Sequence, residues 1–203
     1  MNYLEELSLE LNKLRNGKYV KVNIHLNING ELLALCKRIN KEVANQENNY
    51  IIFNEKSIIV PHISLFMGYI NSFEQFEFVL EAAHDFASQT KSVCVDPTRL
   101  YISDTSFTLS KYLLLDILQN EEIRQYKHYF FNMLYDNIKP MEWDFINEHA
   151  HITLNCFDKV PRRIEKILDK YHEFPNCNIN DIGISISGKK GVCFGNLKTF
   201  SLL

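Results

Sequence analysis

Residues 58–70 read IIVPHISLFMGYI and residues 149–157 read HAHITLNCF. Both stretches are apolar and rich in β-branched or aromatic residues, a composition typical of strands. Each contains a histidine, an isoleucine, a hydroxyl residue and a leucine in succession: His62-Ile63-Ser64-Leu65 and His151-Ile152-Thr153-Leu154. Because residues two apart on a strand point to the same face, each imidazole is expected beside its own hydroxyl. The isoleucines and leucines are then expected to face the core.

The segments around these two stretches repeat one plan. Residues 19–29 alternate between apolar and polar side chains, which predicts a half-buried strand. Helical spacing of apolar residues predicts helices over 2–15, 31–46 and 123–138, the last stopped by Pro140. Ser72 and Gln75 form a capping box that opens another helix, and Pro161 suits the first turn of one more. Further strands are predicted within 92–119, over 182–187, and after a hairpin turn at 188–191.

Strand, helix, motif strand and helix therefore occur once in each half of the chain. This order predicts an α+β fold in which antiparallel sheets are covered by helices. No low-complexity segment or linker separates the halves, which favours one domain over two.

The two motifs carry the residue types that cleavage of a phosphodiester needs. Of seven histidines, only His62 and His151 stand in this pattern. Such cleavage needs a base that activates the attacking oxygen and an acid that protonates the leaving oxygen. Histidine can play either role near neutral pH. The hydroxyls of Ser64 and Thr153 can donate to the non-bridging oxygens, and no metal or other cofactor is required by this logic.

At these residues the sequence resembles the 2H phosphoesterase superfamily, which is named for two His-x-Ser/Thr motifs. The resemblance covers both motifs, their flanks and the strand–helix order over about residues 19–203. It implies two pseudo-symmetric antiparallel sheet lobes with outer helices around a central cleft, formed by residues 18–203 as a single bilobal domain after an N-terminal helix at 1–17. It also implies catalytic roles for His62, Ser64, His151 and Thr153. The usual substrates of the superfamily are 2′,3′-cyclic phosphates, 2′,5′ linkages and related nucleotides.

Four further residues are candidates for contact with substrate. His25 lies on the polar face of the strand at 19–29, together with Lys21, Asn23 and Asn27. Phe66 is expected on the same side as His62 and Ser64, where it could stack on a base, and Tyr112 could do so in the second half. His149 is expected to line the cleft at the start of its strand. For each of them, packing or solvation is the alternative interpretation.

Three other functions stay open at this stage. The enzyme could hydrolyse a signalling nucleotide, such as a 2′,5′-oligoadenylate or a cyclic oligonucleotide. The chain could instead be a module that binds nucleotides or RNA ends without turnover, although binding alone does not need both imidazoles. His149 and His151, two apart on a strand, could also share a metal ion, but no other ligand cluster with suitable spacing accompanies them.

Composition limits the partners and the compartment. Hydrophobic residues make up 46% of the 203 residues, enough for a substantial core. A net charge of −3 argues against a grip on duplex DNA but allows a nucleotide or a short RNA as substrate. Five widely spaced cysteines indicate free thiols in a reducing compartment. Without a signal sequence or a membrane-length apolar stretch, we expect a cytoplasmic monomer.

Overall fold

A computed structural model describes residues 3–44, 50–54, 57–103, 110–118, 120–141, 149–188 and 192–203. The helices are α1 (Tyr3–Arg15), α2 (Gly30–Ala44), α3 (Phe73–Gln89), α4 (Glu121–Leu134) and α5 (Ile164–Lys170). The strands are β1 (Val20–Asn27), β2 (His62–Ile70), β3 (Val93–Val95), β4 (Pro97–Ile102), β5 (Lys111–Ile117), β6 (Lys139–Pro140), β7 (His151–Phe157), β8 (Cys177–Ile179), β9 (Asp181–Ser187) and β10 (Cys193–Ser201). None of the described helices is long and apolar enough to cross a membrane.

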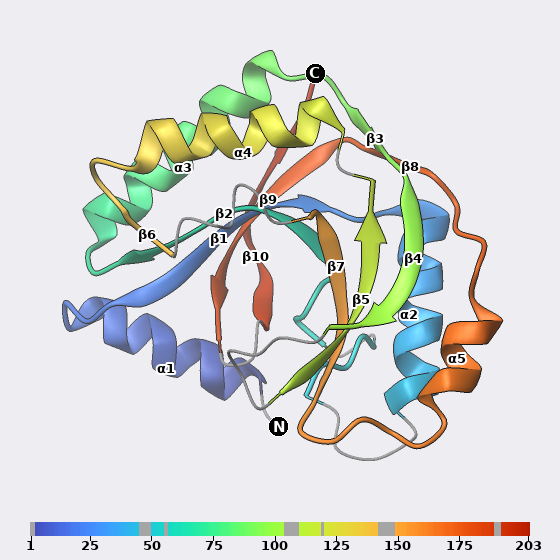
Figure 1. Cartoon of the computed structure of the whole chain (residues 1–203). Helices are drawn as coiled ribbons and strands as arrows, with labels where there is room; N and C mark the ends of the chain where they lie inside the picture. Colours follow the sequence, from blue (N-terminus) through green and yellow to red (C-terminus); the bar gives the residue numbers. More distant parts are fainter. Residues whose placement is uncertain are drawn as a thin grey trace.

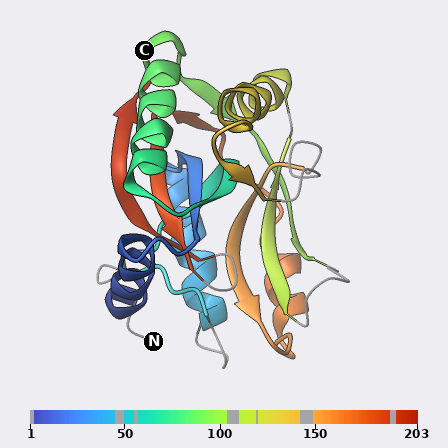
Figure 2. The ribbon, with the colours of Figure 1, turned by 90° about the vertical axis from the view of Figure 1, so that its left-hand side faces the viewer.

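The main sheet is antiparallel and has eight strands, in the order β10-β9-β1-β2-β7-β5-β4, with β6 attached to β2. We call β10, β9, β1 and β2 the first lobe, and β7, β5 and β4 the second lobe. The lobes are joined between β2 and β7, where the one registered pair is Ile63 with Ile152. The sheet curls, and the two lobes stand next to each other in Figure 2. These features confirm the predicted α+β architecture, and they join the two lobes at the centres of the two motifs.

Two helices pack against the lobe formed by the other half of the chain. Helix α2 follows β1 in the chain but packs against β7, and α4 follows β5 but packs against β2. Helix α3 packs against β9 and β10 and lies beside α4, whereas α5 packs against α2. Figure 1 shows the α3–α4 pair at one end of the sheet and the α2–α5 pair along its side. Each motif strand is therefore covered by a helix from the other half of the chain.

Apolar periodicity explains why these elements form a core. Along β1, Val20, Val22, Ile24 and Leu26 are buried, as alternation predicts for the face that the helices cover. Along β9 the buried residues Ile182, Ile184 and Ile186 repeat this pattern. Helix α1 matches its predicted range and contacts β1. Its leucines at helical spacing are Leu4, Leu7, Leu11 and Leu14, and they are buried at one end only, since Leu14 is buried while Leu4 is 63% exposed.

The start of α3 confirms the capping box read from the sequence. The Ser72 hydroxyl accepts a hydrogen bond from the Gln75 backbone N–H at 3.2 Å. The Gln75 side-chain oxygen accepts one from the Asn71 backbone N–H at 2.8 Å, one residue earlier than the usual return bond. These bonds satisfy backbone donors that the first turn of a helix leaves without intrahelical partners.

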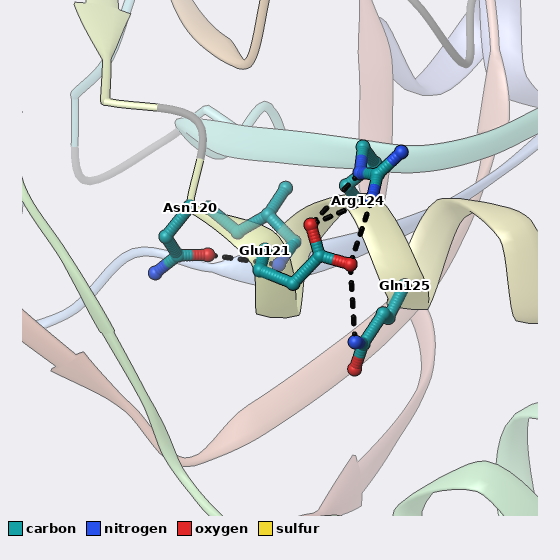
Figure 3. A network of polar contacts seen from close by, with 5 residues as sticks. Asn120, Glu121, Arg124 and Gln125 are labelled. Carbon is teal, nitrogen blue, oxygen red and sulfur yellow. Dashed lines mark hydrogen bonds and ion pairs between the residues drawn. The ribbon is translucent and has the colours of Figure 1, made fainter.

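Helix α4 begins in a polar network that Figure 3 shows from close by. Asn120 is the N-cap, and its side-chain oxygen accepts from the Ile123 backbone N–H at 2.8 Å. Glu121 forms an ion pair with Arg124 at 2.7 Å and accepts from Gln125 at 3.2 Å. An exposed ion pair stabilises little, so the cap is the larger contribution.

The end predicted for α4 is wrong. The helix ends at Leu134 and not at 138, and residues 135–138 form a turn before β6. The apolar spacing continues because the turn still buries Ile138 in the core. Helix α5 begins at Ile164, later than Pro161, whose carbonyl accepts from the Ile164 N–H. Residues 189–191 of the predicted hairpin turn lie outside the described residues.

Candidate active site at the junction of the two motif strands

The two motifs lie side by side on one face of the sheet. In an antiparallel pair, residues directly opposite each other share a face. The Ile63–Ile152 pair therefore places His62 opposite Thr153 and Ser64 opposite His151, one residue to either side. Both isoleucines are fully buried, whereas the four polar side chains are half-buried on the opposite face. In a regular antiparallel pair, the two diagonal histidines would be about 7–8 Å apart, a separation that one phosphate can span.

A β-bulge follows each motif at the same position. On β2, Ser64 lies opposite His25 and Phe66 opposite the next residue, Ile24, so that Leu65 is the extra residue. On β7, Thr153 lies opposite Leu114 and Asn155 opposite Leu113, which makes Leu154 the extra residue. Bulges bend a strand and turn its later side chains to the other face. The two motif strands therefore share local geometry as well as sequence.

The bulge on β2 makes the prediction for Phe66 wrong. Phe66 lies opposite Ile24, on the core face, and is buried. Its ring packs beside Gly68, where an added Cβ would lie 2.8 Å from it. The residues that continue the polar face of β2 are Met67 and Tyr69, which lie opposite Asn23 and Lys21. A ring at position 66 is thus part of the core and has no surface for stacking on a base.

Each motif histidine is held by the backbone two residues before it. His62 Nδ1 lies 2.9 Å from the Val60 carbonyl oxygen, and His151 Nδ1 lies 3.1 Å from that of His149. A carbonyl oxygen only accepts hydrogen bonds, so Nδ1 carries the hydrogen in both rings. Nε2 is then the nitrogen that can gain or lose a proton, and it is the same atom in both motifs.

Asn23 connects the first motif to the neighbouring strands. Its side-chain nitrogen lies 2.8 Å from Ser64 Oγ, 3.1 Å from Cys193 Sγ and 3.3 Å from His62 Nε2. An amide nitrogen has only two hydrogens, so it can serve two of these three atoms at once. The bond to Ser64 occupies a lone pair of the hydroxyl and leaves its own hydrogen for another acceptor. The sequence placed Asn23 on the polar face of β1 but did not show this contact.

His25 lies at the site but is not exposed there. It stands opposite Ser64, and its ring centroid is 4.7 Å from that of His62. Its other neighbour, Gly183, leaves room for the ring, since a Cβ there would lie 2.6 Å from His25 Cε1. The imidazole is fully buried, so it has no surface for the predicted contact with substrate. Burial, together with the charge of His62, lowers the pKa of His25 well below its ordinary value.

The depressed pKa of His25 predicts a dependence of stability on pH. Below the ordinary value of 6.5, the unfolded chain binds a proton at His25 that the folded chain does not. This group therefore favours folding above pH 6.5, and that stability is lost as pH falls. The free energy of unfolding should decline by up to about 1.4 kcal/mol per pH unit more in the wild type than in His25→Gln. Urea unfolding between pH 7 and 5 measures the two slopes, and equal slopes would contradict the neutral state assigned here.

The second motif faces a different set of charges. Asp116 on β5 lies opposite His151, and Arg99 on β4 lies opposite Asp116. Arg99 Nε is 3.2 Å from Asp116 Oδ2, and the guanidinium lies 4.8 Å from the Tyr101 ring centroid. No local pattern in the sequence singles out Arg99 or Asp116, because only the pairing of three strands brings them into line with His151.

The last two candidates take different positions. Tyr112 is half-buried, two residues along β5 from Leu114, and so shares the face of Thr153, as its predicted role requires. The exposed His149 contributes its carbonyl to His151. Within the described residues, no three His, Cys, Asp or Glu side chains come together as ligands for a metal ion.

Comparison with known proteins identifies the fold. The sequence matches no protein-family model and no curated protein. Among solved structures, TT0787 of Thermus thermophilus superposes with a TM-score of 0.61 at 12% identity, over 90% of this chain and 97% of that one. E. coli LigT in its apo form gives 0.61 at 11% identity, over 91% and 98%. E. coli LigT complexed with 3′-AMP gives 0.53 at 13% identity, over the same shares. The chain therefore has the fold of the 2H phosphoesterase superfamily.

Proposed function

We propose that this protein is a phosphodiesterase that cleaves a nucleotide phosphodiester between His62 and His151, without a metal ion. The observation that carries the proposal is the antiparallel Ile63–Ile152 pair, from which we infer that both imidazoles and both hydroxyls share one face. The matching Nδ1 contacts to backbone carbonyls support it, because they make Nε2 the nitrogen that exchanges a proton in both rings. The complex of LigT with 3′-AMP favours a nucleotide as the substrate class.

The proposed reaction needs two proton transfers and one displacement at phosphorus. One imidazole takes the proton from the attacking oxygen as that oxygen bonds to phosphorus. The bond to the leaving oxygen breaks with its electron pair, and the other imidazolium protonates that oxygen. Ser64 and Thr153 donate to the non-bridging oxygens, where negative charge develops. We propose a 2′,3′-cyclic phosphate or a 2′,5′ linkage as substrate, the phosphodiesters that the superfamily resemblance implies.

A substrate panel in the presence of EDTA tests this function. It contains 2′,3′-cyclic nucleotides, 2′,5′-linked dinucleotides including adenylates, and 3′,5′-linked dinucleotides for comparison. We expect turnover of at least one of the first two classes, unchanged by the chelator. Turnover that EDTA abolishes would contradict the metal-independent mechanism. Tight binding of nucleotides with no product from any class would replace the enzyme by a binding module.

The hydroxyls of the motifs should matter for turnover more than for binding. In Ser64→Ala and Thr153→Val, each variant loses one donor to the phosphoryl oxygens, and we expect kcat to fall about 10²-fold with a smaller change in KM. Steady-state kinetics on the preferred substrate measure both constants. Ser88→Ala is the matched control, because Ser88 is an exposed residue of α3 whose hydroxyl donates to the Asp85 carbonyl. A rise in KM with unchanged kcat would show that the hydroxyls contribute to binding of the substrate in its ground state.

A further inference from the structure

Cys193 lies beside the first motif, buried between strands of the first lobe. It is the first residue of β10 and stands opposite Ser187 of β9, which in turn stands opposite Lys21 of β1. Its sulfur lies 3.1 Å from Asn23 Nδ2 and 3.2 Å from Ser187 Oγ. Asn23 thus contacts the thiol, His62 and Ser64 through one atom. No sequence motif singles out this cysteine, and the two-histidine reaction does not use it.

The surroundings of Cys193 favour its thiolate. Burial by itself raises the pKa of the thiol, but the charge of His62 outweighs burial, and the contact of the sulfur with Ser187 Oγ at 3.2 Å adds to this effect. Together they lower the pKa of Cys193 to about 6. Burial lowers the pKa of His62, but the charge of Cys193, together with the hydrogen bond to the Val60 carbonyl, raises it above its ordinary value. Between these two pKa values the pair is a thiolate and an imidazolium.

The other ionisable groups around His62 do not oppose this state. His25 on β1 is neutral, because its pKa lies well below the ordinary value. Lys21, also on β1, is a cation beside Cys193, and the charge of the thiolate opposes the lowering of its pKa by burial. From β9 the nearest groups are the hydroxyls of Ser185 and Ser187, and from β7 the facing histidine is His151. The thiolate is thus the negative charge that strands β1, β2, β9 and β10 bring to His62.

The hydrogen count on Asn23 agrees with a protonated His62. The two shorter contacts of its amide nitrogen, to Ser64 Oγ and Cys193 Sγ, use both hydrogens. None remains for His62 Nε2 at 3.3 Å, and because an amide nitrogen does not accept hydrogen bonds, a proton on Nε2 points away from Asn23. In the second motif the residue opposite His151 is Asp116, which forms an ion pair with Arg99. The two histidines therefore have equivalent backbone anchors and different charged neighbours.

We propose that Cys193 is a positioning residue whose thiolate keeps His62 protonated, so that His62 is the general acid and His151 the general base. The inference rests on the proposed phosphodiesterase function and assigns the two roles within it. His151 takes the proton of the attacking oxygen, and His62 gives its Nε2 proton to the leaving oxygen. Solvent exchange restores both rings after product release. Cys193 forms no bond to substrate and is not consumed.

The first test needs no substrate and so stands apart from the proposed function. The ultraviolet absorbance of the thiolate is followed against pH in the wild type and in Cys193→Ser, with Cys94→Ser as control because Cys94 is an exposed thiol. We expect a titration near pH 6 that disappears in Cys193→Ser and persists in Cys94→Ser. NMR titration of the histidine rings should show the pKa of His62 falling in Cys193→Ser. A Cys193 thiol that titrates near the ordinary 9 would overturn the proposal.

The second test uses the pH dependence of turnover. Without the thiolate, burial should lower the pKa of His62, and the alkaline limb of the kcat profile should move to lower pH. In Cys193→Ser we expect kcat near pH 8 to fall about tenfold more than kcat near pH 6, as a shift of one pKa unit would produce. A merely structural role would lower kcat equally at all pH values, and that result would overturn the assignment. Ser187→Ala, which keeps the cysteine and removes one hydrogen bond, should shift the limb in the same direction by less.

Discussion

Replacing either motif histidine with alanine is expected to lower kcat by roughly 10²- to 10⁴-fold, because each variant loses one of the two proton transfers. The kcat of the double variant His62→Ala/His151→Ala should be little lower than that of the less active single variant, since residues that act as a unit do not contribute additively. Single-turnover kinetics on the preferred phosphodiester measure the chemical step directly. The folded state should persist in both single variants, because both side chains are half-buried at the face of the sheet.

His128→Ala is the control for this experiment, because His128 is an exposed residue of α4 and lies on no motif strand. It should retain wild-type kcat. Turnover that survives in both motif variants would refute the site assignment. A large loss in only one of them would instead point to a reaction that needs a single acid or base.

Asn40→Ala is expected to cause a large loss of stability, because this one side chain serves three backbone groups. Asn40 is a buried residue of α2 whose side-chain nitrogen donates to the carbonyl oxygens of Ile51 at 2.8 Å and Leu154 at 2.7 Å. Its side-chain oxygen accepts from the Phe53 N–H at 2.9 Å. Leu154 is the extra residue of the β7 bulge, so Asn40 satisfies a carbonyl beside the second motif.

Removing this side chain leaves three backbone groups without that partner, at about 1–3 kcal/mol each when buried. We expect the free energy of unfolding to fall by about 3 kcal/mol or more, which corresponds to a decrease in Tm of roughly 6–12 °C for a chain of this size. Urea and thermal unfolding measure both quantities. Asn16→Ala, which removes one exposed hydrogen bond after α1, should change stability by less than about 0.5 kcal/mol. A loss of under about 1 kcal/mol in Asn40→Ala would show that water or local rearrangement satisfies these groups.

The parts of the site that sequence could predict are those set by local periodicity. A strand repeats every two residues, so His62 with Ser64, and His151 with Thr153, could be placed on shared faces before any pairing was known. Phe66 could not be placed correctly, because the bulge that turns it inward arises from the register between β2 and β1. No pattern within β2 alone reports that register.

The residues missed altogether are those that only distant pairing brings to the motifs. Cys193 reaches His62 because β10, β9 and β1 pair in that order, and Asp116 reaches His151 because β5 pairs with β7. Within its own strand, neither residue belongs to a motif or pattern that would indicate a role at the site. The helix boundaries were predicted well where a side chain caps the helix, as at Ser72. They were predicted poorly where apolar spacing continues into a turn, as at Ile138.

The exchange of α2 and α4 between the lobes limits how this chain can be made and divided. When the first half leaves the ribosome, the apolar side of α2 (Leu32, Leu35, Ile39 and Val43) has no β7 to cover, because β7 has not yet been synthesised. A fragment cut between the halves would leave one helix uncovered in each piece. Neither half is therefore expected to be a separable module that could be grafted onto another protein. The face that carries both histidines forms only when β7 of the second half has paired with β2 of the first.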